Sequence, residues 1–172
     1  MFPRLSKELP YMLSNREFSG LVDRGTYPEQ VAVPLDQPFV NANGVIQNLV
    51  LERFTSAAII TSVPGAIRAN HYHKTDWHYS YVVKGSVWYY WRPIGSTDKP
   101  RHQVFGQGTM FFTPPLVEHA MFFPEDTAFL TFAKNIRDHD HHESDVVRVE
   151  LVQAERDAAA PGGFRVSFPT SK

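Results

Sequence analysis

Residues 65–85 read GAIRANHYHKTDWHYSYVVKG and carry the pattern that decides the fold. Residues two apart on a β-strand face the same side, so His71 and His73 would present two imidazoles next to each other. His78 opens the next apolar run, and the KGS triplet at 84–86 predicts a tight hairpin between two strands. The stretch therefore predicts neighbouring antiparallel strands that bring three histidines to one place.

Short apolar or β-branched runs continue from Gly44 onward, with prolines and glycines between them. Such punctuation is typical of turns between strands. The predicted strands cover residues 44–54, 57–63, 79–83, 87–91, 110–113, 120–123, 128–133 and 146–152. This spacing predicts an all-β sandwich or barrel. Alternation within 87–91 separates odd-numbered from even-numbered side chains, without saying which set lines the interior.

The length of 172 residues predicts a single domain over 1–172. We expect an N-terminal arm over 1–43, the barrel over 44–155 and a tail over 156–172. Residues 6–18 could form a short helix, and the prolines that follow favour an extended arm along a sheet edge or a partner subunit. In the tail, alternating apolar residues from Phe164 to Phe168 could add an edge strand.

The composition excludes several classes of protein. With 42% hydrophobic and 20% charged residues, the chain is neither wholly disordered nor fibrous. A net charge of −1 offers no basic excess for phosphate contacts, so no nucleic-acid partner is expected. Without cysteine, a metal can bind only His, Asp or Glu. No apolar run could span a membrane and the N-terminus has no signal-like apolar region, so we expect a cytoplasmic protein.

A fourth histidine, His119, follows the Pro-Pro turn at 114–115 and precedes another short strand. Two ligands on one strand, one on its neighbour and one that returns late would build a metal centre in an antiparallel barrel. We therefore predict that one divalent transition metal ion is bound by His71, His73, His78 and His119. Imidazole ligands leave Zn, Fe, Ni and Mn open as its identity. Asp76 is the alternative to His78.

The run HDHHE at 139–143 is a second histidine cluster, which we interpret as a solvated loop, with a second metal site as the alternative. Three cationic residues could contact an anionic substrate near the barrel mouth, although each is more often an ordinary surface charge: Arg68, Arg92 and Lys134. The many aromatic residues between 72 and 91 could stack on a substrate ring, but core packing is the commoner role.

The glycine spacing around the histidines resembles the two motifs of the cupin superfamily. Residues 65–85 resemble G-x5-H-x-H-x3/4-E-x6-G, and residues 108–123 resemble G-x5-P-x-G-x2-H-x3-N. The resemblance implies an antiparallel jelly-roll barrel, or double-stranded β-helix. His78 stands in place of the Glu ligand, which leaves a bound divalent ion with a formal charge of +2 rather than about +1. Leu116 and Phe123 replace the Gly and Asn of the second motif, and a changed turn would tolerate them.

The stretch NHYHKTDWHYSYVVKG at 70–85 is most similar to cupin domains of capsular-sugar epimerase/reductase proteins. That resemblance implies a metal-assisted epimerase or isomerase acting on a keto sugar or similar carbonyl substrate, with a sugar or nucleotide sugar as ligand. A looser similarity to deoxysugar epimerases implies a metal-free His–Asp pair.

Two other functions remain open. Iron in the site would favour a dioxygenase, and a closed zinc site would favour a non-catalytic barrel that binds a small ligand. The sequence offers Tyr and Asp side chains as the general base and does not choose between them. An open barrel end and a Pro-rich arm favour a homodimer.

Overall fold

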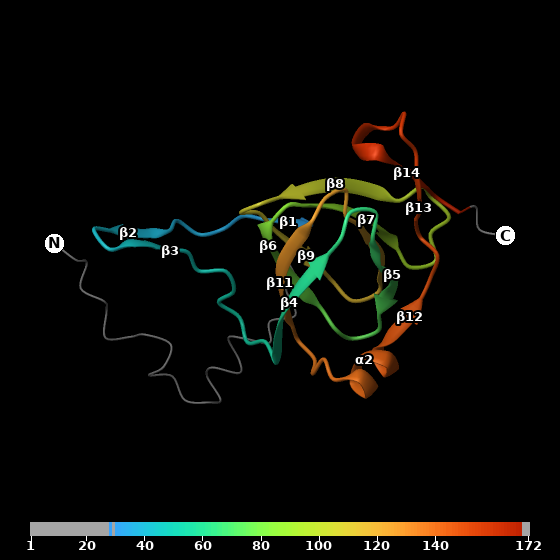
Figure 1. Cartoon of the computed structure of the whole chain (residues 1–172). Coiled ribbons are helices and arrows are strands. Elements are labelled where there is room, and N and C mark those ends of the chain that lie inside the picture. Colours follow the sequence, from blue (N-terminus) through green and yellow to red (C-terminus); the bar gives the residue numbers. More distant parts are fainter. Residues whose placement is uncertain (1–27, 29, 170–172) are drawn as a thin grey trace.

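The computed structural model describes residues 28 and 30–169, and its core is a pair of five-stranded antiparallel sheets (Figure 1). One sheet has the strand order β1-β9-β6-β11-β4 and the other β12-β5-β10-β7-β8. The strands are β1 (Ala32–Val33), β4 (Ser56–Ser62), β5 (Ile67–His73), β6 (His78–Lys84), β7 (Ser86–Pro93), β8 (Arg101–Gly106), β9 (Met110–Thr113), β10 (Val117–Phe122), β11 (Thr127–Ala133) and β12 (Val146–Arg148). The all-β jelly-roll prediction is confirmed.

The tight turn predicted at 84–86 forms, but the hairpin predicted around it was wrong, because β6 and β7 do not pair with each other. Gly85 has a φ of +79°, and a Cβ there would lie 2.6 Å from the carbonyl oxygen of Asp126. Only glycine fits this turn without strain. The turn instead passes the chain from β6, in one sheet, to β7, in the other.

The odd-numbered side chains of β7 face the interior. Val87 and Tyr89 are fully buried and pack with phenylalanines from the facing sheet, among them Phe111. The even-numbered Trp88 and Tyr90 lie on the outer face instead. Burying an aromatic or aliphatic side chain of this size stabilises the fold by about 1.5–3 kcal/mol, so this interior row is a main source of stability.

The tail covers that outer face. A two-stranded sheet of β13 (Gln153–Arg156) and β14 (Phe164–Ser167), joined through the 3-10 turn η2 (Pro161–Gly163), lies against the even-numbered aromatics of β7. The ring centroid of Phe164 is 5.5 Å from that of Phe122, and the ring of Phe168 is 5.6 Å from that of Tyr90. The alternation in the tail therefore does produce a strand, paired with β13.

The N-terminal segment contributes β1, which pairs with β9 at a sheet edge, as expected of an extended arm. A hairpin of β2 (Phe39–Asn41) and β3 (Gly44–Ile46) then projects away from the barrel (Figure 1). The strand predicted over 44–54 was wrong beyond residue 46: Leu49 and Val50 pack against the aromatic cluster around Trp77 as irregular backbone. The helix predicted over 6–18 lies outside the described residues.

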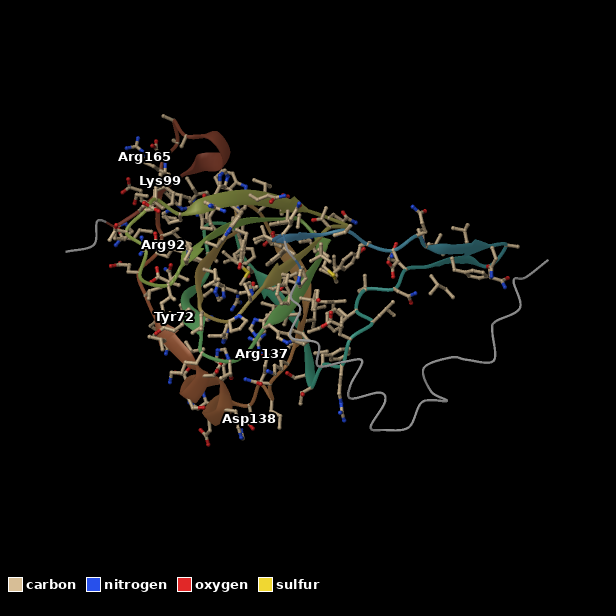
Figure 2. The ribbon with its side chains drawn as sticks, turned by 180° about the vertical axis from the view of Figure 1, so that it is seen from behind. Tyr72, Arg92, Lys99, Arg137, Asp138 and Arg165 are labelled. Carbon is tan, nitrogen blue, oxygen red and sulfur yellow. The ribbon has the colours of Figure 1, made fainter. Side chains whose placement is uncertain are left out.

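The run at 139–143 is a helix rather than a solvated loop. Helix α2 (His139–Asp145) begins after Asp138, whose side chain accepts a hydrogen bond from the His141 backbone, as an N-cap does. The helix leads directly into β12 and lies at one end of the barrel, with Arg137 and Asp138 beside it (Figure 2). Among the described helices, none is long and apolar enough to cross a membrane.

Candidate metal centre

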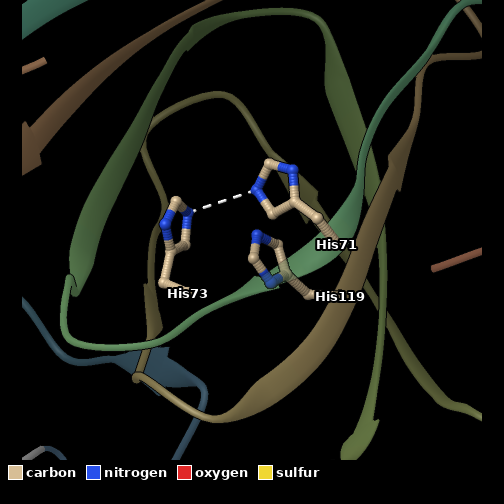
Figure 3. Close-up of side chains that lie close together, drawn as sticks. All are labelled: His71, His73 and His119. Carbon is tan, nitrogen blue, oxygen red and sulfur yellow. Dashed lines mark hydrogen bonds between the residues drawn. The ribbon is translucent and has the colours of Figure 1, made fainter. Parts of the chain in front are cut away.

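Three of the four predicted histidines converge inside the barrel (Figure 3). His71 and His73 lie on β5, and His119 on β10 is the direct strand partner of His71. One ring nitrogen from each lies within 4.8 Å of the others, and the Nε2 atoms of His71 and His73 are 3.2 Å apart. As the sequence predicts, His71 and His73 lie on the same side of β5, and His119 joins them from a strand later in the chain.

The tautomers that these histidines adopt suit metal ligation. The Nδ1 of His73 donates to Oδ2 of Asp145 at 3.1 Å, and the Nδ1 of His119 donates to the carbonyl of Val117 at 3.1 Å. Each of these bonds leaves an Nε2 lone pair for the centre. Nitrogens bound to one ion at 2.0–2.1 Å would be separated by about 2.9–3.4 Å. The observed 3.2 Å between His71 and His73 fits that range.

The electrostatics of the cluster keep the imidazoles neutral. Burial, followed by the proximity of His73, lowers the pKa of His71 to about 3. Burial and the neighbouring His78 lower the pKa of His73 to about 4. Burial also holds the pKa of His119 well below its usual value. Metal ligation requires neutral imidazoles, so the donor set fits a divalent transition metal near neutral pH.

A bulge in β5 aims His71 at the centre. Ala69 and Asn70 have φ values of 65° and 52°, and the pairing with β10 shifts register at this point. Left-handed backbone is costly for alanine, so the surroundings must hold it. The Asn70 side chain does so, since its Oδ1 accepts from the backbone N–H of Leu151 and Val152 and its Nδ2 donates to the Val152 carbonyl. The sequence interpretation missed this residue.

His78 is placed differently from the other three histidines. Its Nε2 is 2.9 Å from Oδ2 of Asp76, and together with His73 these residues form a second group of ligand-type atoms. Burial raises the pKa of Asp76, but the hydrogen bond and charge of His78 outweigh it, and the net shift is downward. The two alternatives for the fourth ligand are thus bonded to each other. Ligation of a metal ion by His78 stays a prediction. To bind the ion, His78 would have to use Nδ1, or its Nε2 would have to give up the hydrogen bond to Asp76.

Asp145, at the end of α2, holds the loop that follows β5. Besides His73, its carboxylate accepts hydrogen bonds from the backbone N–H and hydroxyl of Thr75 and from the backbone N–H of Asp76. A carboxylate behind a ligating histidine fixes the ring and raises its basicity. Asp145 is the most important site residue that the sequence interpretation missed, since the run before β12 looked solvated.

Leu116 occupies the glycine position of the second motif, yet its backbone has the left-handed conformation that suits glycine. Its φ is 58°, and its backbone N–H donates to the carbonyl of His73 at 2.8 Å. The turn therefore keeps a left-handed conformation that glycine would adopt without strain. The hydrogen bond ties the turn before β10 to the end of β5, which positions His119 relative to His73.

A cavity of about 240 Å³ lies beside the cluster with Tyr89 as the wall between them, and none of the four predicted histidines lines it. Tyr89 forms that wall: its ring lies 6.1 Å from that of His119 in a stacked orientation, and its hydroxyl is 2.9 Å from that of Thr113. Burial raises the pKa of Tyr89, so the phenol stays protonated. The cavity is lined by Pro28, Gln30, Val31, Tyr89, Trp91, Pro93, Arg101, Phe112, Pro114 and Val117.

The cations singled out from the sequence do not line this cavity. Arg92 is ion-paired with Glu118 at 2.6 Å and lies on the side of the barrel near Lys99 (Figure 2). Arg68 donates to the hydroxyl of Ser62 and the carbonyl of Thr61. Lys134 borders a different cavity, beside α2. Among the described residues, Arg101 is the cation that lines the cavity next to the cluster.

Solved structures with a similar fold include sugar 3,4-ketoisomerases and a capsular polysaccharide assembling protein. QdtA, a sugar 3,4-ketoisomerase from Thermoanaerobacterium thermosaccharolyticum solved with TDP, has a TM-score of 0.54 at 19% identity, over 65% of this chain and 82% of that one. The 3,4-ketoisomerase WlaRA from Campylobacter jejuni gives 0.54 at 12% identity, over 64% and 83%. The capsular polysaccharide assembling protein CapF from Staphylococcus aureus gives 0.50 at 17% identity, over 68% and 32%. At these identities the likeness is one of fold.

Among characterised protein sequences, none matches this chain significantly. A family model described as cupin matches residues 46–155, which include both histidine motifs and every barrel strand from β4 to β12. With the jelly-roll topology and the convergence of His71, His73 and His119, this match shows that the chain belongs to the cupin family.

Proposed function

We propose that this cupin is a metal-assisted isomerase or epimerase acting on a keto sugar, carried in the cell as a nucleotide sugar. The observation that carries the proposal is the convergence of three neutral imidazoles beside a cavity of about 240 Å³. The similarity in fold to sugar 3,4-ketoisomerases supports the reaction class. A divalent transition metal held by His71, His73 and His119 would polarise a carbonyl oxygen and so acidify the adjacent C–H bond.

We assign proton transfer to the His78–Asp76 pair. Asp76 accepts from Nε2 of His78, which fixes the tautomer and leaves Nδ1 as the nitrogen that takes a proton. In the proposed step, the C–H bond next to the carbonyl breaks, its electron pair forms an enediolate, and the proton moves to Nδ1. Return of that proton to the former carbonyl carbon, together with transfer of the neighbouring hydroxyl proton to the former carbonyl oxygen, completes an isomerisation, and Asp76 stabilises the imidazolium in between.

The cavity beside His119 is the proposed substrate pocket. Its aromatic wall, Tyr89 and Trp91, suits the face of a sugar or base ring, and these two rings stack on each other with centroids 5.6 Å apart. Arg101 on its lining would pair with the diphosphate, since guanidinium groups bind phosphate oxygens through parallel hydrogen bonds.

The protein is also proposed to act as a homodimer. The β2–β3 hairpin projects from the barrel with apolar side chains that are largely exposed, such as Val40 at 65% and Val45 at 64%. An isolated two-stranded hairpin is marginally stable in water, so packing against a second copy would stabilise it. Light scattering on the intact chain would measure the mass directly.

The activity is tested with TDP-4-keto-6-deoxyglucose, the sugar nucleotide bound in one QdtA structure. The metal-loaded protein and substrate are mixed in deuterium oxide and followed by proton NMR. We expect deuterium to replace the hydrogen next to the carbonyl. His78→Ala should slow this exchange by about 100-fold or more, while the exposed His141→Ala should leave it unchanged.

Metal content measured on the same variants separates the roles. Under the proposal, His71→Ala loses the ion, whereas His78→Ala keeps it and loses only activity. Loss of the ion from His78→Ala would instead make His78 a ligand, as the motif predicts. No exchange by wild-type protein loaded in turn with zinc, manganese, iron and nickel would refute the proposed substrate class.

A further inference from the structure

Helix α2 carries a histidine that the cupin motifs do not include and that faces the same centre. The ring centroid of His142 lies 6.0 Å from that of His71 and 5.8 Å from that of His73. His142 is half-buried, in contrast to the exposed His139 and His141 on the same helix. Within the described residues, the ring of His142 makes no hydrogen bond, so both of its nitrogens are available.

The helix is fixed to the centre by its own C-terminal end. Asp145 lies three residues after His142, so the two side chains share one helix face. Asp145 binds Nδ1 of His73, and its backbone carbonyl accepts from the N–H of Lys74 at 2.9 Å. Lys74 also donates through its side chain to the Ser144 carbonyl at 2.7 Å. The face that carries His142 is therefore held against the end of β5, where His73 lies, and the loop that follows it.

The distances allow His142 to share an ion with the barrel histidines. An imidazole centroid lies about 3.2 Å from an ion that the ring binds, so two rings on one ion are about 4.5–5.2 Å apart at ordinary coordination angles and at most about 6.4 Å apart when they lie opposite each other. Both separations of His142 fall inside the upper limit, next to values of 4.7, 4.8 and 5.6 Å among the barrel rings. The nitrogens of His142 are not yet within the compact group formed by His71, His73 and His119, so binding requires a small inward turn of its ring.

We propose that His142 is a further metal ligand, supplied by α2 across the barrel mouth, so that the ion joins the helix to the barrel. The proposal rests on the metal centre of the proposed function. It gives the centre four imidazoles without His78, whose Nε2 is already bonded to Asp76. It also gives α2 two roles at the centre. Asp145 bonds the outer ring nitrogen of His73, and His142 binds the ion directly.

Cobalt binding tests the proposal without any substrate. Metal-free wild-type protein, His142→Ala, His142→Gln, His141→Ala and His71→Ala are titrated with Co²⁺ in competition with a chelating indicator. We expect both His142 variants to bind Co²⁺ at least about 10-fold more weakly and to show altered visible absorption bands, because one nitrogen ligand is lost. The His141→Ala control should match wild type, since His141 is exposed and bonds only Asp138 and its own helix.

Proton NMR of the cobalt-loaded protein in water counts the ligands. Each bound imidazole with a ring N–H gives a paramagnetically shifted exchangeable signal, and His142→Ala should lose one that His141→Ala keeps. Unchanged affinity, spectrum and signal count in His142→Ala, with cobalt binding abolished in His71→Ala, would overturn the assignment and leave the barrel centre intact. Failure of wild-type protein to bind cobalt at all would refute the metal centre itself, and with it this ligand. Circular dichroism on each variant confirms that it is folded.

Discussion

Replacing Asp145 with asparagine should loosen the end of β5, where His73 lies, and the loop that follows it. The carboxylate accepts through Oδ1 from the backbone and hydroxyl of Thr75, at 2.9 and 2.7 Å, and through Oδ2 from His73 and the backbone of Asp76, at 3.1 and 3.2 Å. Asparagine keeps one oxygen, so two of these donors would meet an amide NH₂. Hydrogen bonds to a charged group contribute about 1.5–3 kcal/mol each, and the loss should therefore be about 3 kcal/mol or more.

The assay is urea unfolding of the metal-free protein, followed by tryptophan fluorescence, since Trp77 lies next to the loop. Asp140→Asn, on an exposed position of the same helix, is the matched control and should leave the unfolding free energy unchanged. Metal affinity should also fall about 10–100-fold in Asp145→Asn, as it does when a carboxylate behind a ligating histidine is removed. A loss below about 1 kcal/mol with unchanged metal affinity would refute the role assigned to Asp145.

Three further predictions concern the bulge, the left-handed turn and pH. Asn70→Ala should lower the unfolding free energy by about 2–3 kcal/mol in urea, because its bonds to residues 151–152 are lost; an unchanged value would show that the bulge holds itself. Leu116→Gly should raise the thermal unfolding temperature, since left-handed backbone costs about 1–2 kcal/mol for a residue with a side chain; a decrease would contradict this. Metal-free stability should fall as pH drops below 6.5, because unfolded imidazoles then bind protons while His71 and His73, with pKa values of about 3 and 4, do not. Unfolding free energies that are equal at pH 7 and about pH 5 would contradict the last prediction.

The parts of the site that local patterns determine could be predicted from the sequence. The two-residue period of a strand places His71 and His73 on one side, and Gly85 fixes the turn after β6 because only a residue without Cβ fits beside the Asp126 carbonyl. His119 could be added from its position after the Pro-Pro turn. These features depend only on residues that are close together in the chain, so they can be predicted from a single sequence.

The rest depends on pairing between distant segments. β12 lies beside β5 only in the folded barrel, with Val146 opposite His73, and that pairing delivers Asp145 and His142 to the centre. The sequence does not predict the bulge at Ala69, because alanine rarely adopts left-handed backbone. It does so here only while Asn70 is anchored. A charged run such as 139–143 is interpreted as solvent-exposed as long as the strand against which it packs is unknown.

The metal content of untagged protein, purified without nickel resin and measured by plasma mass spectrometry, tests the central claim most directly. The account predicts close to one transition metal ion per chain in the wild-type protein, lost in His71→Ala and in His119→Ala while both variants remain folded. A folded wild-type protein that contains no transition metal, and takes none up when it is supplied, would contradict the account.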